Sequence, residues 1–164
     1  MSGEVWRPLT GHLAHWSWDH LIWDCVVFVT LGFLCELRYR KLTYLTLITS
    51  AILIPLVFAF FVDLDRYGGL SGLVTSLFAL LVTSLFFEQW QKRDRLGLIL
   101  CALLFLGMIG KLTWELVTGE FLVVGGSDGT IEPVPLAHMT GAVIGTGWKL
   151  RWPQIDTPPR NVLI

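Results

Sequence analysis

Five long apolar runs constrain this chain more than any other feature of its sequence. They cover roughly residues 18–37, 42–62, 70–87, 96–117 and 134–148. A helix needs about 20 apolar residues to cross a hydrocarbon core, so the first four runs are about long enough and the fifth is short. Apolar residues lie all round each run rather than on one stripe, which indicates helices embedded in lipid. The sequence therefore predicts an all-α polytopic membrane protein, a bundle of five transmembrane helices.

The composition agrees with a single membrane domain and argues against some partners. Of the 164 residues, 54% are hydrophobic and 15% are charged, which is unlike a soluble domain. The formal net charge of −1 argues against nucleic acid as a partner. The three cysteines lie in apolar runs without metal-ligand spacing, so we expect no metal and no cofactor.

Basic residues gather in the loops on one side of the predicted bundle. They follow the first, third and fifth runs, whereas the long loop before the fifth run is acidic. By the positive-inside rule the basic loops are cytoplasmic, which places the N-terminus of this chain outside and its C-terminus inside. We expect a membrane domain over residues 1–151 and a cytoplasmic tail over 152–164. The basic residues are Arg38, Arg40, Lys41, Lys92, Arg93, Arg95, Lys149, Arg151 and Arg160.

This orientation brings three polar side chains to one depth near the outer face. Ser71 begins the third run, His138 lies near the start of the fifth, and His20 lies near the start of the first. An ionisable group inside a membrane is a functional hypothesis by default. A serine near a histidine could act as a nucleophile with its base. We place no acidic residue beside His138, so the expected arrangement is a Ser–His dyad.

Small residues surround both members of this dyad. Gly69 and Gly72 flank the serine and would let the backbone approach a substrate closely. Gly141 and Gly145 follow the histidine at a spacing that lets two membrane helices pack tightly. The third and fifth runs are therefore expected to lie against each other.

Four motifs, in order along the chain, resemble those of the rhomboid intramembrane serine proteases. They are Trp6-Arg7, the segment His15 to Asp24, Gly69-Leu70-Ser71-Gly72, and Ala137-His138 with Gly141 and Gly145. The compact chain looks most like the bacterial rhombosortase branch, which is associated with cleaving proteins that carry a GlyGly-CTERM sorting tail. The resemblance implies a protein of the bacterial inner membrane. It also implies a serine endopeptidase that cuts single-span or C-terminally anchored membrane proteins near the outer face.

The resemblance also assigns roles to residues. Ser71 would be the nucleophile, His138 the general base, and His20 a support for the oxyanion together with the Ser71 backbone N–H. Asp24 stands where many rhomboids have asparagine, so it would have to be protonated or orient His20 instead. Thr75 stands where well-known members have a tyrosine that packs on the histidine. Rhomboids carry a helix before the Trp-Arg loop, and this sequence reaches the loop almost at once, so we expect either a fragment or misassigned start of a longer protein or a five-span minimal form.

Two other functions are compatible with the same residues. One is a rhomboid-like pseudoprotease that binds membrane clients without cleaving them. The other is a metal or haem membrane protein that uses four histidines, namely His12, His15, His20 and His138. Lys111 and Glu115, four residues apart in the fourth run, are expected to form an ion pair. That pair is either structural or part of substrate docking or a proton path.

Overall fold

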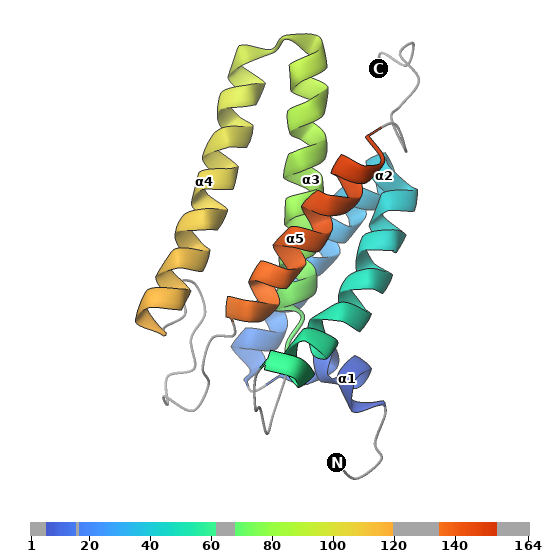
Figure 1. Ribbon diagram of the computed structural model, residues 1–164, viewed down its shortest axis with the longest axis vertical. Coiled ribbons are helices and arrows are strands. Elements are labelled where there is room, and N and C mark those ends of the chain that lie inside the picture. Colours follow the sequence, from blue (N-terminus) through green and yellow to red (C-terminus); the bar gives the residue numbers. More distant parts are fainter. Residues whose placement is uncertain (1–5, 16, 62–67, 120–134, 154–164) are drawn as a thin grey trace.

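The structure, a computed structural model, describes residues 6–15, 17–61, 68–119 and 135–153, without the side chains of residues 7 and 8. Within these ranges every regular element is a helix, which confirms the predicted all-α class (Figure 1). The elements are α1 (Arg7–Thr10), the 3-10 helix η1 (Gly11–Leu13), α2 (Trp18–Phe61), α3 (Ser71–Lys92), α4 (Arg95–Thr118) and α5 (Pro135–Arg151).

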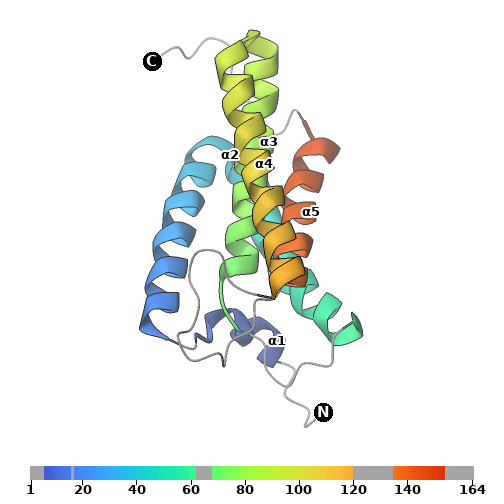
Figure 2. The same cartoon turned by 90° about the vertical axis from the view of Figure 1, so that its left-hand side faces the viewer.

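Helix α2 contains the first two predicted runs, because the chain turns inside it. Tyr39 leaves the helical region with φ −137° and ψ 48°, and the two legs of α2 run in opposite directions on either side of it (Figure 2). The Tyr39 hydroxyl donates a hydrogen bond to Glu88 of α3, and Arg38 donates to the same carboxylate at 3.0 Å. The polar segment between the two apolar runs therefore forms a turn that is tied to α3.

The number of membrane-spanning helices differs from the five that we expected. Among the described residues, α2, α3 and α4 are long and apolar enough to cross a membrane. Helix α5 has only 17 residues, and its three glycines, two threonines and His138 lower its hydropathy. The expectation of five separate spans is thus not confirmed, because two runs share α2 and the last run forms a short, less apolar helix.

Helix α3 lies at the centre of the bundle, and α4 lies at its edge. Half of the most apolar window of α3 is buried, compared with 6% of the corresponding window of α4. Two apolar clusters pack α2, α3 and α5 together. One cluster contains Cys35, Tyr39, Leu42, Leu77 and Leu80; the other contains Ile54, Phe58, Leu70, Leu73 and Ala137.

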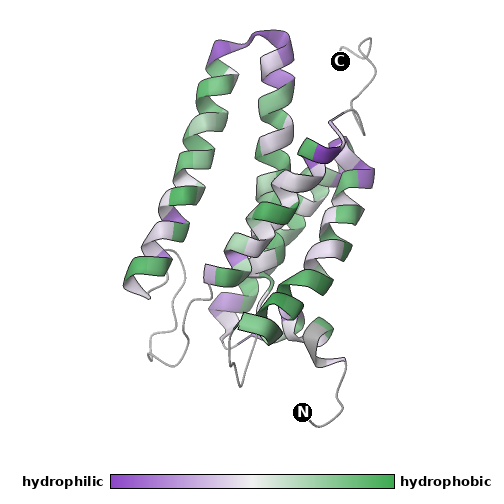
Figure 3. Cartoon of the chain, in the orientation of Figure 1, coloured by the Kyte–Doolittle hydropathy of each residue, from purple (hydrophilic) through white to green (hydrophobic). Residues whose placement is uncertain are grey.

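The two ends of the bundle differ in chemistry. The turn of α2, the α3–α4 connection and the C-terminal end of α5 lie toward one end, where Figure 3 shows hydrophilic residues. The N-terminal ends of α2, α3 and α5 lie toward the other end (Figure 1). The three segments that carry the predicted site residues therefore share one end of the bundle.

Candidate active site

Close packing of α3 against α5 brings the serine and histidine segments together. A Cβ atom on Gly141 would lie 2.2 Å from the Gly72 carbonyl oxygen, and one on Gly145 would lie 2.0 Å from that of Ser76. Only glycine allows two backbones to approach this closely. A Cβ on Gly72 would in turn lie 3.3 Å from the Cβ of Ala137. The residues that precede Gly72 and follow Ala137 are Ser71 and His138.

Ser71 and His138 occupy the first turns of their helices. Ser71 opens α3, where backbone N–H groups have no partner within the helix. His138 is 3% exposed, and Ser71 is half-buried. In the described part of the chain, no hydrogen bond joins the Ser71 hydroxyl to the His138 ring. Catalytic hydrogen bonds often tighten only when substrate binds, so the dyad stays a prediction.

A buried carboxylate from α4 contacts the histidine. Glu115 is 1% exposed, and its Oε2 lies 2.7 Å from His138 Nδ1. The Glu115 side chain also accepts a hydrogen bond from Lys111, whose Nζ lies 3.5 Å from His138 Nδ1. Because Glu115 makes the shorter contact, Nδ1 carries a proton and donates it to Glu115. The lone pair of the imidazole is then on Nε2, the nitrogen that can act as a base.

This contact corrects the expectation that no acidic residue lies beside His138. The predicted Lys111–Glu115 ion pair is present, but it includes the histidine as a third member. The spacing of the two residues in α4 predicts that they pair with each other. The sequence does indicate that Glu115 and His138 lie at a similar depth, since Glu115 lies near the end of one run and His138 near the start of the next. The sequence does not show which face of α4 turns toward α5.

A second polar group surrounds the turn before Ser71. Gly69 has φ 108°, and a Cβ there would lie 3.2 Å from His20 Nε2 and 3.4 Å from Asp24 Oδ2. The Asp24 carboxylate accepts a hydrogen bond from the Leu70 N–H at 2.8 Å. His20 Nε2 lies 3.4 Å from the same Asp24 oxygen. The Asp24 carboxylate therefore contacts both the backbone of the turn before Ser71 and the His20 ring, and it holds the two together.

His15, which the sequence indicates only as one of four histidines in the metal or haem alternative, also reaches this group. Its Nε2 lies 3.3 Å from Asp24 Oδ2, and its ring packs edge-on to His20 at 5.0 Å between centroids. The signal was its position in the same His-rich motif. His12, in η1, lies 3.1 Å from the Ala51 carbonyl oxygen through Nε2 and is buried. The structure therefore places two of the four histidines, His15 and His20, beside Asp24.

The remaining residues that the resemblance names are Trp6, Arg7 and Thr75. Trp6 is 56% exposed, and its carbonyl oxygen accepts from the Thr10 hydroxyl at 3.2 Å. Arg7 opens α1, and its side chain lies outside the described residues. Thr75 donates to the Ser71 carbonyl oxygen at 2.8 Å, so it supports the helix backbone below the serine.

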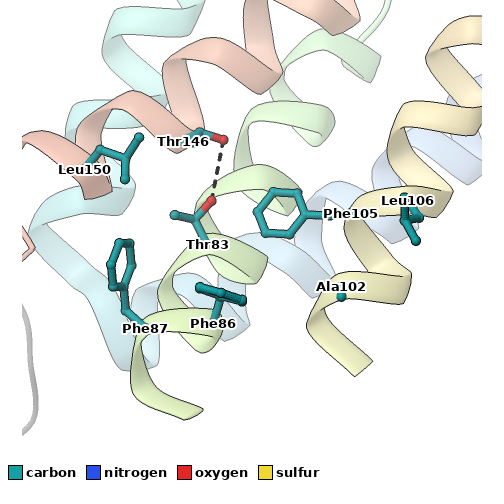
Figure 4. A pocket seen from close by; sticks show the side chains of 8 residues that line it. All are labelled: Thr83, Phe86, Phe87, Ala102, Phe105, Leu106, Thr146 and Leu150. Carbon is teal, nitrogen blue, oxygen red and sulfur yellow. Dashed lines mark hydrogen bonds between the residues drawn. The ribbon is translucent and has the colours of Figure 1, made fainter. Parts of the chain in front are cut away.

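An apolar groove lies between α3, α4 and α5, well away from the serine. Its volume is about 500 Å³. On its wall the Thr83 hydroxyl donates a hydrogen bond to the Thr146 hydroxyl at 3.5 Å, drawn as a dashed line in Figure 4. Thr83 is 12 residues after Ser71 in α3, a rise of about 18 Å. The groove therefore does not belong to the polar groups around Ser71.

Comparison with known proteins identifies the family. The family model described as Rhomboid domain matches residues 2–152. Neither the curated proteins nor the solved structures gave a significant match. The matched segment covers nearly the whole chain and includes every helix described above. The chain therefore belongs to the rhomboid family of intramembrane serine proteases.

Proposed function

We propose that this protein is a serine endopeptidase in which Ser71 attacks the peptide bond and His138 is the general base. The observation that carries the proposal is the buried contact of 2.7 Å between His138 Nδ1 and Glu115. His138 belongs to α5, which packs closely against α3. A histidine held this way keeps Nε2 available as a base. In the proposed arrangement Nε2 of that ring would face the Ser71 hydroxyl at the first turn of α3.

The proposed reaction follows acyl-transfer chemistry. His138 Nε2 takes the hydroxyl proton while Ser71 Oγ forms a bond to the scissile carbonyl carbon. The oxyanion would accept hydrogen bonds from the Ser71 backbone N–H and from His20 Nε2. The carbon–nitrogen bond then breaks, and the amine leaves with the proton that His138 carries. Water hydrolyses the acyl-enzyme by the same steps and frees Ser71.

Glu115 would act as a positioning residue for His138. Its carboxylate accepts the Nδ1 proton, which fixes the tautomer and stabilises the imidazolium that forms as Ser71 loses its proton. Lys111 on the other side of Glu115 would keep the carboxylate charged. The proposed unit is thus a serine, a histidine and a glutamate contributed by three helices.

The substrate and the topology are also part of the proposal. Single-span or C-terminally anchored membrane proteins would be cut near the outer face, including proteins with GlyGly-CTERM sorting tails. The two legs of α2 together with α3, α4 and α5 would make five crossings. The basic turn of α2, the α3–α4 connection and the end of α5 would then lie in the cytoplasm of a bacterial cell.

The test compares matched variants of the full chain in membranes. Ser71→Ala and His138→Ala should lose labelling by a fluorophosphonate probe and lose cleavage of a substrate with a GlyGly-CTERM tail. The matched control is Ser76→Ala, a buried serine one turn further along α3 whose hydroxyl donates to the Leu73 carbonyl oxygen. The Ser76 variant should keep both activities.

The two readouts separate the possible failures. Probe labelling that depends on Ser71, without cleavage of the tail, would retain the nucleophile and reject the substrate. Equal labelling of the wild type and Ser71→Ala would reject the catalytic proposal itself and favour a pseudoprotease that binds membrane clients.

A further inference from the structure

We propose that His15, His20 and Asp24 form a binding site for a divalent zinc ion, and that zinc bound there inhibits cleavage. The inhibition rests on the function proposed above, whereas the binding does not. The three residues converge from the segment before α2 and from its first two turns. One potential ligand atom from each residue, a ring nitrogen of each histidine and an oxygen of Asp24, lies within 4.8 Å of the other two.

The first argument is the hydrogen bonding of His15. Its Nδ1 lies 3.0 Å from the Leu13 carbonyl oxygen, which can only accept, so Nδ1 carries the proton. Its Nε2 is buried and, in the described part of the chain, makes no hydrogen bond. The His15 side chain is 5% exposed, and this nitrogen faces Asp24 Oδ2 at 3.3 Å. Two lone pairs that face each other need a proton or a cation between them.

The second argument is the geometry of the three groups. Zinc bonds to nitrogen and oxygen ligands are about 2.0–2.1 Å long, which separates two ligands of a tetrahedral site by about 3.3 Å. The Asp24 oxygen lies 3.3 Å from His15 Nε2 and 3.4 Å from His20 Nε2. Two histidines and one carboxylate are a common ligand set for zinc, with a fourth position left for water.

The third argument is the support around the ligands. A metal-binding histidine usually donates its other N–H to a carbonyl or carboxylate, and His15 does so to Leu13. Ligating carboxylates are themselves hydrogen-bonded, and Asp24 accepts from the Leu70 N–H. Asparagine at position 24 would replace the anionic ligand with a neutral amide. The carboxylate thus favours a cation where an amide would not.

Inhibition follows from the second role of His20. With zinc on Nε2, that nitrogen has no N–H left to donate to an oxyanion. The metal would also lie beside Gly69, since a Cβ there would touch both His20 and Asp24. Zinc binding and oxyanion stabilisation by His20 would therefore exclude each other.

The binding test uses the full chain in detergent, purified without a polyhistidine tag and stripped with a chelator. Zinc titration against a chromogenic chelator should give one site per chain, and it should do so equally in the Ser71→Ala background. Asp24→Asn and His15→Gln should each weaken binding at least tenfold. Cobalt substituted for zinc should give the visible absorption of a tetrahedral site, and Asp24→Asn should remove it.

Two controls share chemistry with the ligands but not their place. Asp19→Asn removes an exposed carboxylate from the same end of α2, and Cys25→Ser removes the thiol next to Asp24. Both should bind zinc as the wild type does. Zinc affinity that does not change in Asp24→Asn and His15→Gln would overturn the site.

The inhibition test measures cleavage against free zinc. Wild-type cleavage should fall as the site fills and recover with chelator. In His15→Gln the zinc concentration for half inhibition, relative to the variant's own metal-free rate, should rise at least tenfold. Binding without inhibition, or activation by zinc, would overturn the inhibitory role and leave the site itself standing. A wild-type chain that cleaves nothing but binds zinc would count against the proposed function and not against the site.

Discussion

Glu115→Gln is the substitution that tests the proposed machinery most directly. Glutamine has nearly the same shape as glutamate but no negative charge. Glu115 is 1% exposed and makes its contact to His138 Nδ1 at 2.7 Å, so the change is felt by the imidazole without an intervening solvent layer. The variant should bind substrate normally and turn it over slowly, because Glu115 contacts Nδ1 and not Nε2, the nitrogen that is proposed to take the proton of Ser71.

The size of the effect can be worked out from the contact. A carboxylate and an imidazolium whose charges are about 4 Å apart interact by about 4 kcal/mol at an effective dielectric constant of about 20. In the proposed mechanism the imidazolium forms only as Ser71 loses its proton, so this energy would stabilise the transition state and not the resting enzyme. A loss of 4 kcal/mol corresponds to about a 10³-fold fall in kcat.

Lys111 provides a second, opposite perturbation. Its Nζ lies 3.5 Å from His138 Nδ1, and in Glu115→Gln it would be a cation without its anion beside the imidazolium. Adding Lys111→Met to Glu115→Gln should therefore restore part of kcat, by about tenfold. A gain of activity from a second substitution is expected of coupled charges and not of general damage.

The assay measures kcat and KM separately on one cleavable substrate, in proteoliposomes. Glu88→Gln is the matched control, because Glu88 is also a hydrogen-bonded carboxylate with a side-chain exposure of only 14%, and its partners lie at the turn of α2. This control should lower stability and leave kcat within about threefold. The reasoning is refuted if Glu115→Gln folds and keeps kcat within threefold of the wild type, or if its loss falls on KM alone.

Three further predictions concern two tightly packed glycines and one buried histidine. Gly145→Ala places a methyl group 2.0 Å from an α3 carbonyl oxygen and should lower the free energy of unfolding by about 1–3 kcal/mol. In the same denaturant titration Gly147→Ala, with open space around it inside α5, should leave the free energy of unfolding unchanged or raise it by up to about 1 kcal/mol. Gly69 has φ 108°, and the methyl group of Gly69→Ala would lie 3.2 Å from the His20 ring, so cleavage should fall more than tenfold. The control Gly119→Ala, at φ 68° with no neighbour within 4 Å, should lower stability only. Burial lowers the pKa of His12 below 6.5, so acidification below pH 6.5 should lower the melting temperature, and less so in His12→Gln.

The fold could be predicted where a local pattern decides it. The third and fourth runs, expected near 70–87 and 96–117, correspond to α3 and α4 because long apolar stretches form helices whatever surrounds them. The turn at Tyr39 could be placed only roughly. The basic residues around it mark a loop, but the backbone there stays helical on both sides and is fixed by Glu88 from a distant helix.

The candidate site could be predicted only where a motif names the residue. The glycine-rich segments around Ser71 and His138 indicate these two residues as candidates. The spacing of Gly141 and Gly145 predicts the close approach of their helices. The contact of Glu115 with His138 depends on how α4 is rotated about its axis. Because apolar residues lie on all sides of α4, the sequence does not indicate which face turns toward α5. The contact of His15 with Asp24 depends on how the segment before α2 folds back.

The exposure of α4 explains why the Lys111–Glu115 pair faces inward. Only Cys101 and Glu115 are buried among the residues of this helix. A carboxylate in lipid is costly unless it is paired, and Glu115 is paired on both sides, with Lys111 and with His138. The same contact therefore fastens the end of α4 to α5 and fixes the tautomer of the proposed base. Separating α4 from α5 at this end would leave Glu115 without its histidine and His138 without its acceptor, so the position of α4 and the readiness of His138 are physically linked.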